Sequence, residues 1–177
     1  MRELDRTEKT VNTYFPNGVI YSSAVYENNK ITKCSKYYTN GCIAQKIGYS
    51  NGMIVLKEQY NRAGDMAEVI SYAYDAFGQL EKITREKTNN IDFIIFERDE
   101  IRKRIVRIYV KHNNIIIRRL EYTYYGDSNI ECHDADYNND IRYRITQAPC
   151  ADESWLNINP RTSMVMRKLR TALELSA

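Results

Sequence analysis

Turn-forming clusters recur about every dozen residues along this chain, and that spacing restricts its fold more than any other feature. Consecutive clusters lie roughly 10–14 residues apart, the interval expected of short strands joined by tight hairpins. Asn and Gly dominate because hairpin turns need positive φ, which these residues adopt at least cost. The clusters are Asn17-Gly18, Asn28-Asn29, Asn40-Gly41, Asn51-Gly52, Ala63-Gly64, Phe77-Gly78, Asn89-Asn90, Asp99-Glu100, Asn113-Asn114, Gly126-Asp127 and Asn138-Asn139.

An aromatic residue precedes nearly every turn, and an aliphatic residue follows it. Across a hairpin such a pair can meet on one face and contribute roughly 0.2–1 kcal/mol. The repetition predicts a ladder of tyrosine against isoleucine along the chain; the turn near Asn89 alone lacks its aromatic. The pairs are Tyr14 and Ile20, Tyr26 and Ile31, Tyr38 and Ile43, Tyr49 and Ile54, Tyr60 and Met66, Tyr74 and Leu80, Phe96 and Ile101, Tyr109 and Ile115, Tyr124 and Ile130, Tyr137 and Ile141.

Eleven turns predict an all-β fold, an antiparallel meander of about twelve short strands. A sheet of that width stays open and twisted, curls, or closes into a barrel. We expect a curled open sheet, with a barrel as the alternative. Residues 91–96, 105–110 and 115–117 are apolar at both odd and even positions, so we expect both faces of the sheet to be covered there. Residues 162–175 carry apolar side chains at helical spacing, which predicts a C-terminal helix packed on the sheet.

No linker or change of composition divides the 177 residues, so we expect one domain. Residues 1–12 form a charged N-terminal arm, for which the sequence does not choose between a short helix and a frayed end. Residues 13–147 form the hairpin-repeat sheet. Residues 148–177 form a loop and the amphipathic helix, which belong to the same domain.

The charge and the cysteines limit the classes of partner and compartment. Lys and Arg number 26 and Asp and Glu 23, a net charge of +3 that is too balanced to make nucleic acid the first candidate partner. No apolar run is long enough to span a membrane, and the charged start is unlike a secretory signal. Four scattered cysteines without a C-x-x-C pair indicate reduced thiols, and hence a cytoplasmic protein.

One segment carries a family motif. Residues 72–84, Tyr-Ala-Tyr-Asp-Ala-Phe-Gly-Gln-Leu-Glu-Lys-Ile-Thr, resemble the YD repeat of RHS-type proteins. The earlier copies of Tyr-x-Asn-Gly-x-Ile are similar to the second MORN-type repeat family, found in small bacterial proteins classed as antitoxin-like. The two resemblances together cover roughly residues 13–145. RHS proteins coil their strands into a shell around a toxin, for which this chain is too short. The short-repeat family implies a module that binds another protein, such as a cognate toxin, and neither family implies catalytic residues.

Several residues have side chains suited to catalysis or metal binding, but their spacing predicts no site. His133 lies in Cys132-His133-Asp134-Ala135-Asp136, but successive side chains of an extended segment point to opposite faces. The Asx residues that follow lack the glycine and the bidentate glutamate of a calcium loop. Phosphate-binding and common hydrolase motifs are absent from the sequence. We therefore expect no catalytic residues, no metal and no cofactor.

Charge is segregated along the second half of the chain. Basic residues dominate 98–119, and 121–141 contains six acids and no Lys or Arg. These stretches either pair across strands or form a bipolar surface that binds a partner. The candidate binding residues are Arg102, Arg104, Arg107, Tyr109, Arg118, Asp127, Glu131, Asp134 and Asp136.

The sequence favours a non-enzymatic protein-binding module, most specifically an antitoxin or immunity protein of a bacterial toxin system. One alternative is an enzyme with a polar cleft near residues 107–136, which would need Asp134, His133 and Arg107 on one face. Another is a self-assembling repeat protein, since an open sheet has two edges that can pair into a homodimer. Nucleic acid, contacted by Tyr109 and Tyr122 with the basic residues, is a less favoured partner.

Overall fold

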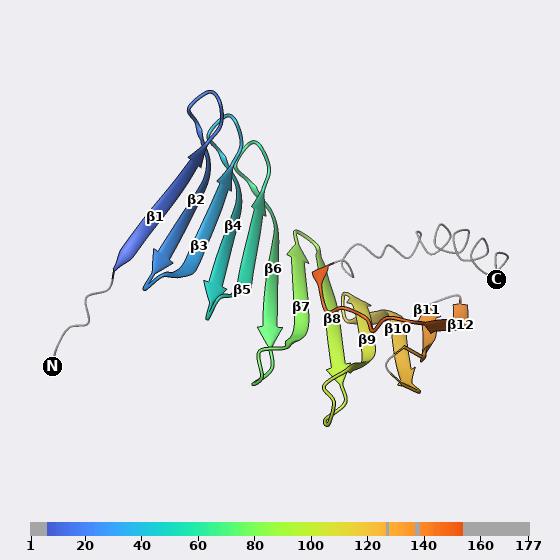
Figure 1. Ribbon diagram of the computed structural model, residues 1–177. Helices are drawn as coiled ribbons and strands as arrows, with labels where there is room; N and C mark the ends of the chain where they lie inside the picture. The colour runs from blue at the N-terminus through green and yellow to red at the C-terminus, as the bar shows by residue number, and fades with distance from the viewer. Residues whose placement is uncertain (1–6, 127, 137–138, 154–177) are drawn as a thin grey trace. The chain divides into compact units, whose positions relative to one another are not determined.

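A computed structural model describes residues 7–126, 128–136 and 139–153. These residues form twelve antiparallel strands whose order in the sheet follows their order in the chain (Figure 1). The strands are β1 (Glu8–Tyr14), β2 (Ile20–Glu27), β3 (Lys30–Tyr37), β4 (Ile43–Ser50), β5 (Met53–Tyr60), β6 (Met66–Tyr74), β7 (Leu80–Lys87), β8 (Asn90–Arg98), β9 (Ile105–His112), β10 (Ile115–Tyr124), β11 (Ile130–Asp136) and β12 (Asn139–Ile145). The all-β meander is confirmed. The sheet is open, with β1 and β12 at its ends, so the barrel alternative is wrong.

The two-residue turns have the backbone that their sequences predict. Asn113 and Asn114 have φ of 47° and 67°, and Asn51 and Gly52 have φ of 51° and 80°. Positive φ at both positions gives the turn a twist that matches the flanking strands. Asparagine and glycine at these sites therefore serve the backbone rather than a ligand.

The longer loops reveal a second period that the twelve-residue spacing conceals. Loops 15–19, 38–42 and 61–65 begin 23 residues apart, one hairpin per repeat. In each, the first residue's N–H donates to the fifth residue's carbonyl, and the glycine N–H donates back to the first residue's carbonyl. The repeating unit here is thus a pair of strands, with a long loop at one end and a two-residue turn at the other.

Hydrogen bonds join the second and third of these loops. The Tyr38 hydroxyl donates to the carbonyl of Tyr60 at 2.7 Å, and Asn40 Nδ2 donates to the carbonyl of Arg62 at 3.2 Å. The Arg62 guanidinium also lies 5.8 Å from the Tyr38 ring centroid. Residues 22 positions apart in sequence are thereby held side by side.

Replacing Tyr38 with Phe should remove the hydroxyl that joins these two loops. We expect Tyr38→Phe to lower the free energy of unfolding by about 0.5–1.5 kcal/mol, the usual net value of one hydrogen bond. Tyr14→Phe is the matched control, because the Tyr14 side chain is exposed and its hydroxyl has no hydrogen bond within the described residues. Urea denaturation measures both variants, and equal stabilities would contradict the proposed role of this hydroxyl.

The predicted pairing of tyrosine with an aliphatic residue is confirmed through β1–β6, at strand positions where the register shifts. The partners there are Tyr14 and Ile20, Tyr26 and Ile31, Tyr37 and Ile43, Tyr49 and Ile54, and Tyr60 and Met66. The third pair uses Tyr37, not the predicted Tyr38. Farther along, Tyr124 faces Ile130 as predicted, but Tyr109 faces Ile95 and Arg119. The predicted ladder therefore does not continue unbroken along the chain.

The chain divides into two compact units, residues 1–73 with 84–91, and residues 74–83 with 92–177. Among the described residues of the first unit, Ile70 is the one fully buried hydrophobic side chain, so neither face of its strands carries a core. The core belongs to the second unit. Its buried hydrophobic residues are Ile83, Ile94, Phe96, Ile105, Ile108, Val110, Leu120, Tyr122, Ile130 and Cys132.

In the part of the second unit that the structure describes, one face of the strands is more deeply buried than the other. Ile94, Ile108 and Ile130 have exposed fractions of 0%. Ile95 and Tyr109, from the opposite face, are only half-buried. Among the described residues, fully buried side chains therefore gather on one face of these strands; the helix expected to cover the sheet lies outside those residues, so coverage of both faces stays a prediction.

Two expectations concern the ends of the chain. β1 begins at Glu8, inside the stretch 1–12 that the sequence suggested as an arm. The helix predicted at 162–175 lies outside the described residues and stays a prediction, as does the curl of the sheet.

Candidate interaction surface

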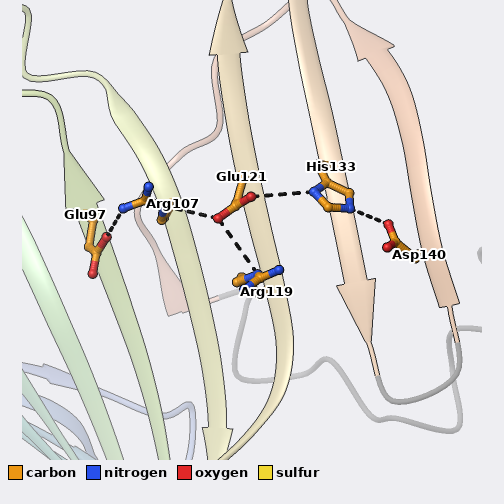
Figure 2. Close-up of polar contacts among 6 residues, drawn as sticks. All are labelled: Glu97, Arg107, Arg119, Glu121, His133 and Asp140. Carbon is orange, nitrogen blue, oxygen red and sulfur yellow. Dashed lines mark hydrogen bonds and ion pairs between the residues drawn. The ribbon is translucent and has the colours of Figure 1, made fainter.

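A row of charged side chains crosses β8–β12 on one face of the second unit (Figure 2). Strand register places Glu97 opposite Arg107, Arg107 opposite Glu121, and Glu121 opposite His133. Arg107 donates from Nη1 to Glu97 and from Nε to Glu121, at 3.2 Å in each case. His133 Nδ1 lies 3.5 Å from Glu121 Oε2, and His133 Nε2 contacts Asp140 Oδ1. Hairpin register thus aligns Glu97, Arg107, Glu121 and His133 across four strands, and Asp140 of β12, which lies opposite Ala135, contacts His133.

We call this side of β8–β12 the outward face. By the alternation of side chains along each strand, it also carries Tyr109, Lys111, Arg119, Thr123, Glu131, Ala135, Asp140, Arg142 and Arg144. The hydrogen bond that Arg107 donates to Glu97 is the main cause that raises the pKa of the Arg107 guanidinium above its ordinary value. The Arg107 and Glu97 side chains are 48% and 43% exposed, so water screens the attraction between them. This face offers charge to a partner and adds little to stability.

A second arginine–carboxylate pair lies on the opposite, core face. Arg118 donates to both oxygens of Asp134, Nε to Oδ1 at 2.9 Å and Nη2 to Oδ2 at 2.6 Å. Their side chains are only 20% and 11% exposed. Burial opposes the charge on Arg118, but the hydrogen bonds and charge of Asp134 outweigh it, so the pKa of Arg118 lies above its ordinary value. This two-point contact joins β10 to β11.

The predicted binding residues do not form one cluster. Arg107, Tyr109 and Glu131 lie on the outward face. Arg118, Asp134 and Asp136 lie on the core face of the same strands. The other three lie elsewhere: the Arg104 guanidinium stacks 4.2 Å from the Tyr124 ring, Arg102 is exposed in the loop after β8, and Asp127 lies outside the described residues.

Sequence reasoning missed the outward-face roles of Arg119, Glu121, Asp140, Arg142 and Arg144. A signal for them was present, because each lies an even number of positions from another outward residue of its own strand. Relating one strand to the next also requires the hairpin register, and register shifts such as the one between Ile116 and Arg118 break simple counting. The two oppositely charged stretches do pair across strands, through Arg107 with Glu121 and Arg118 with Asp134.

The enzyme alternative needed Asp134, His133 and Arg107 on one face. His133 and Arg107 lie on the outward face, and Asp134 points to the core face, so the three do not converge. In the part of the chain that the structure describes, no three His, Cys, Asp or Glu side chains are placed to hold a metal ion. Tyr122, the proposed stacking partner of a nucleic acid, is 7% exposed and lies in the core.

A hollow of ≈ 210 Å³ lies where β10 extends past the end of β11. This volume is below the range of about 300–1,000 Å³ that is usual for small-molecule sites. The hollow is lined by Ile116, Ile117, Arg118, Arg119, Ala135 and Asp136.

The free cysteines differ sharply in accessibility, which predicts an order of reaction with alkylating agents. Cys150 is exposed, whereas Cys132 is buried and burial raises the pKa of its thiol. Because the thiolate is the reactive form, we expect iodoacetamide to modify Cys150 first and Cys132 only when the protein unfolds. Peptide mass spectrometry over a time course measures this order, and early modification of Cys132 in the native protein would contradict its placement.

Asp99 organises the loop between β8 and β9 and predicts a pH dependence. Its carboxylate accepts the backbone N–H of Arg102, and also those of Arg104 and Ile101 at 3.2 and 3.1 Å, and these bonds hold its pKa below the ordinary value. A lowered folded-state pKa stabilises the protein above about pH 4, and this stabilisation is lost as the pH falls through the folded-state value.

We therefore expect Asp99→Asn to lower the urea midpoint at pH 6 and to have a smaller effect at pH 3. Glu100→Gln, the same charge change at the exposed neighbouring residue, is the control. An effect of Asp99→Asn that is equal at both pH values would contradict this role of the carboxylate.

Comparison with known proteins finds neither a family model nor a curated protein that matches this chain. The residues that the structure describes include no helix with the length and hydrophobicity needed to cross a membrane.

Proposed function

We propose that this chain is a non-enzymatic module that binds another protein, and that its partner is a toxin against which it acts as antitoxin or immunity protein. The observation that carries the proposal is the outward face of β8–β12. Arginine, tyrosine and carboxylate side chains spread across five strands there, while the opposite face of the same strands forms the core. Arginine and tyrosine are enriched at protein interfaces, and charge complementarity governs partner choice.

Two further features support a protein partner. The outward residues come from adjacent strands of a hydrogen-bonded sheet, so their positions are fixed before a partner arrives, which lowers the cost of association. The resemblance of the hairpin repeats to antitoxin-like repeats supplies the toxin as the class of partner, and the free thiols favour action in the cytoplasm.

Co-expression with the product of the adjacent gene tests this proposal. We expect a stoichiometric complex to co-purify, a measurable affinity by calorimetry, and relief of growth inhibition when the neighbour is toxic. Arg119→Glu, a change on the outward face, should weaken the complex by about tenfold or more. Lys36→Glu, the same charge change at an exposed lysine of β3, is the matched control.

Two outcomes would contradict the proposal. One is no complex and no neutralisation with the products of the genes on either side. The other is a complex that weakens equally with both variants, because contact through the outward face requires Arg119→Glu to have the larger effect.

A further inference from the structure

The acidic and basic residues of the outward face are not equally engaged. Each acid contacts a partner on that face or beside it: Glu97 contacts Arg107, and Asp140 contacts His133. Glu131 accepts the Tyr125 hydroxyl at 3.2 Å. Glu121 is shared, as its carboxylate lies near Arg107, Arg119 and His133 at 3.2, 3.9 and 3.5 Å. Each of these four carboxylates is therefore already engaged by a neighbouring side chain.

Basic charge remains, and it is concentrated on β12. The Arg142 side chain is 70% exposed, and its nearest carboxylate among the described residues, that of Glu131, is 4.0 Å away. Arg144 is exposed and makes no ion pair or hydrogen bond within the described part of the chain. Two arginines two residues apart thus project from one face of one strand without a strong acidic partner.

β12 is also the last strand of the sheet. Within residues 7–153, as far as the structure describes them, β11 is its one paired neighbour. The far edge of such a strand carries backbone N–H and C=O groups that can pair with an added strand. The register places Ile141, Tyr143 and Ile145 opposite Asp134, Cys132 and Ile130 of the core face. From Ile141 to Ile145, β12 therefore alternates basic side chains on the outward face with apolar side chains on the core face.

We infer that the edge of β12 receives an extended segment of the protein partner in which acidic and apolar residues alternate. The backbone of the segment pairs with β12, its acidic side chains meet Arg142 and Arg144, and its apolar side chains continue the core face beside Ile141 and Tyr143. Strand addition of this kind takes its affinity from main-chain hydrogen bonds and its specificity from alternate side chains. The inference rests on the proposed function and specifies its partner.

A fluorescein-labelled peptide, Val-Glu-Val-Glu-Val-Glu-Val with blocked ends, is the probe, and Val-Lys-Val-Lys-Val-Lys-Val is its counterpart. By fluorescence anisotropy the full chain should bind the glutamate peptide at least about tenfold more tightly than the lysine peptide. The double variant Arg142→Glu with Arg144→Glu should reverse that preference. The control variant Lys33→Glu with Lys36→Glu makes the same change of net charge at two exposed lysines of β3. It should leave the preference for the glutamate peptide unchanged.

A glutamate peptide methylated at alternate backbone nitrogens separates strand addition from diffuse attraction. We expect it to bind at least about tenfold more weakly, because it keeps the charges and loses main-chain donors. Equal binding of the two peptides, an unchanged preference in the double variant, or self-association of the chain through β12 would overturn the inference. If the glutamate peptide fails while the gene-neighbour complex forms, the inference falls and the proposed function stands. If the glutamate peptide does not bind and no gene-neighbour complex forms, both the inference and the proposed function are contradicted.

Discussion

Asp134→Ala is expected to lower the free energy of unfolding by about 3 kcal/mol, because it removes the two-point counter-charge of the largely buried Arg118 guanidinium and leaves it the weaker attraction of Asp136 opposite. Arg118 makes its two-point contact with Asp134 at side-chain exposures of 20% and 11%, so little water reaches the site to compensate. The cost reflects a poorly compensated buried charge more than the value of the pair itself. Urea denaturation followed by circular dichroism measures it.

Glu97→Ala provides the matched control, because it also removes the carboxylate of an arginine pair between neighbouring strands. There Arg107 and Glu97 are 48% and 43% exposed, and Arg107 keeps its second contact with Glu121. We expect a much smaller loss than for Asp134→Ala, because water screens this pair. Equal losses for Asp134→Ala and Glu97→Ala would contradict the assignment of these pairs to opposite faces of the strands.

Replacing both partners of the buried pair tests the reason for the effect. The double variant Arg118→Leu with Asp134→Leu removes both charges and keeps apolar volume in the core. We expect it to be more stable than Asp134→Ala alone by about 2 kcal/mol or more, since paired buried charges can be exchanged for packed hydrophobic residues at small cost. A double variant no more stable than the single one would show that the loss comes from packing or register instead.

Leu120→Ala is the second substitution with a large expected effect. Leu120 is 1% exposed on β10, between strands that carry Ile108 and Asp134 at the opposing positions. Truncating a buried leucine removes its transfer free energy and leaves a cavity, at a cost of about 2–5 kcal/mol.

Leu56→Ala is its control in the first unit. Leu56 is 37% exposed on β5, so the same truncation should cost about 1 kcal/mol. Thermal or urea unfolding of both variants measures the difference. A cost for Leu56→Ala as large as that for Leu120→Ala would mean that the first unit has a core of its own.

The strand count and the meander were predictable because local chemistry determines the turns. Asparagine pairs such as Asn113-Asn114 adopt the positive φ that a two-residue hairpin turn needs, whatever lies around them. Most of the turns predicted from the sequence lie close to the observed turns. One exception is Asn90, which is predicted in a turn but is the first residue of β8. The 23-residue repeat was also in the sequence, in the glycines Gly18, Gly41 and Gly64, but the shorter period concealed it.

The surface was harder to predict because it depends on non-local register. Arg107 and Arg118 both looked like exposed bases in one charged stretch, yet register places them on opposite faces. The shift between Ile116 and Arg118 changes which β10 residues share a face with a given β9 residue, and no residue type reports such a shift reliably. Runs that are apolar at both odd and even positions suggested two covered faces. Among the described residues one face is buried, and Ile95 and Tyr109 remain partly open on the other.

The outward face requires β10 to present alternate side chains to the core and to solvent, and single cysteines along the strand test this directly. Arg119→Cys, Leu120→Cys, Glu121→Cys, Tyr122→Cys and Thr123→Cys would each be labelled under native conditions and quantified by peptide mass spectrometry. We predict fast labelling at 119, 121 and 123 and slow labelling at 120 and 122. A uniform rate, the opposite phase, or a period of three to four residues would contradict the outward face and the function drawn from it.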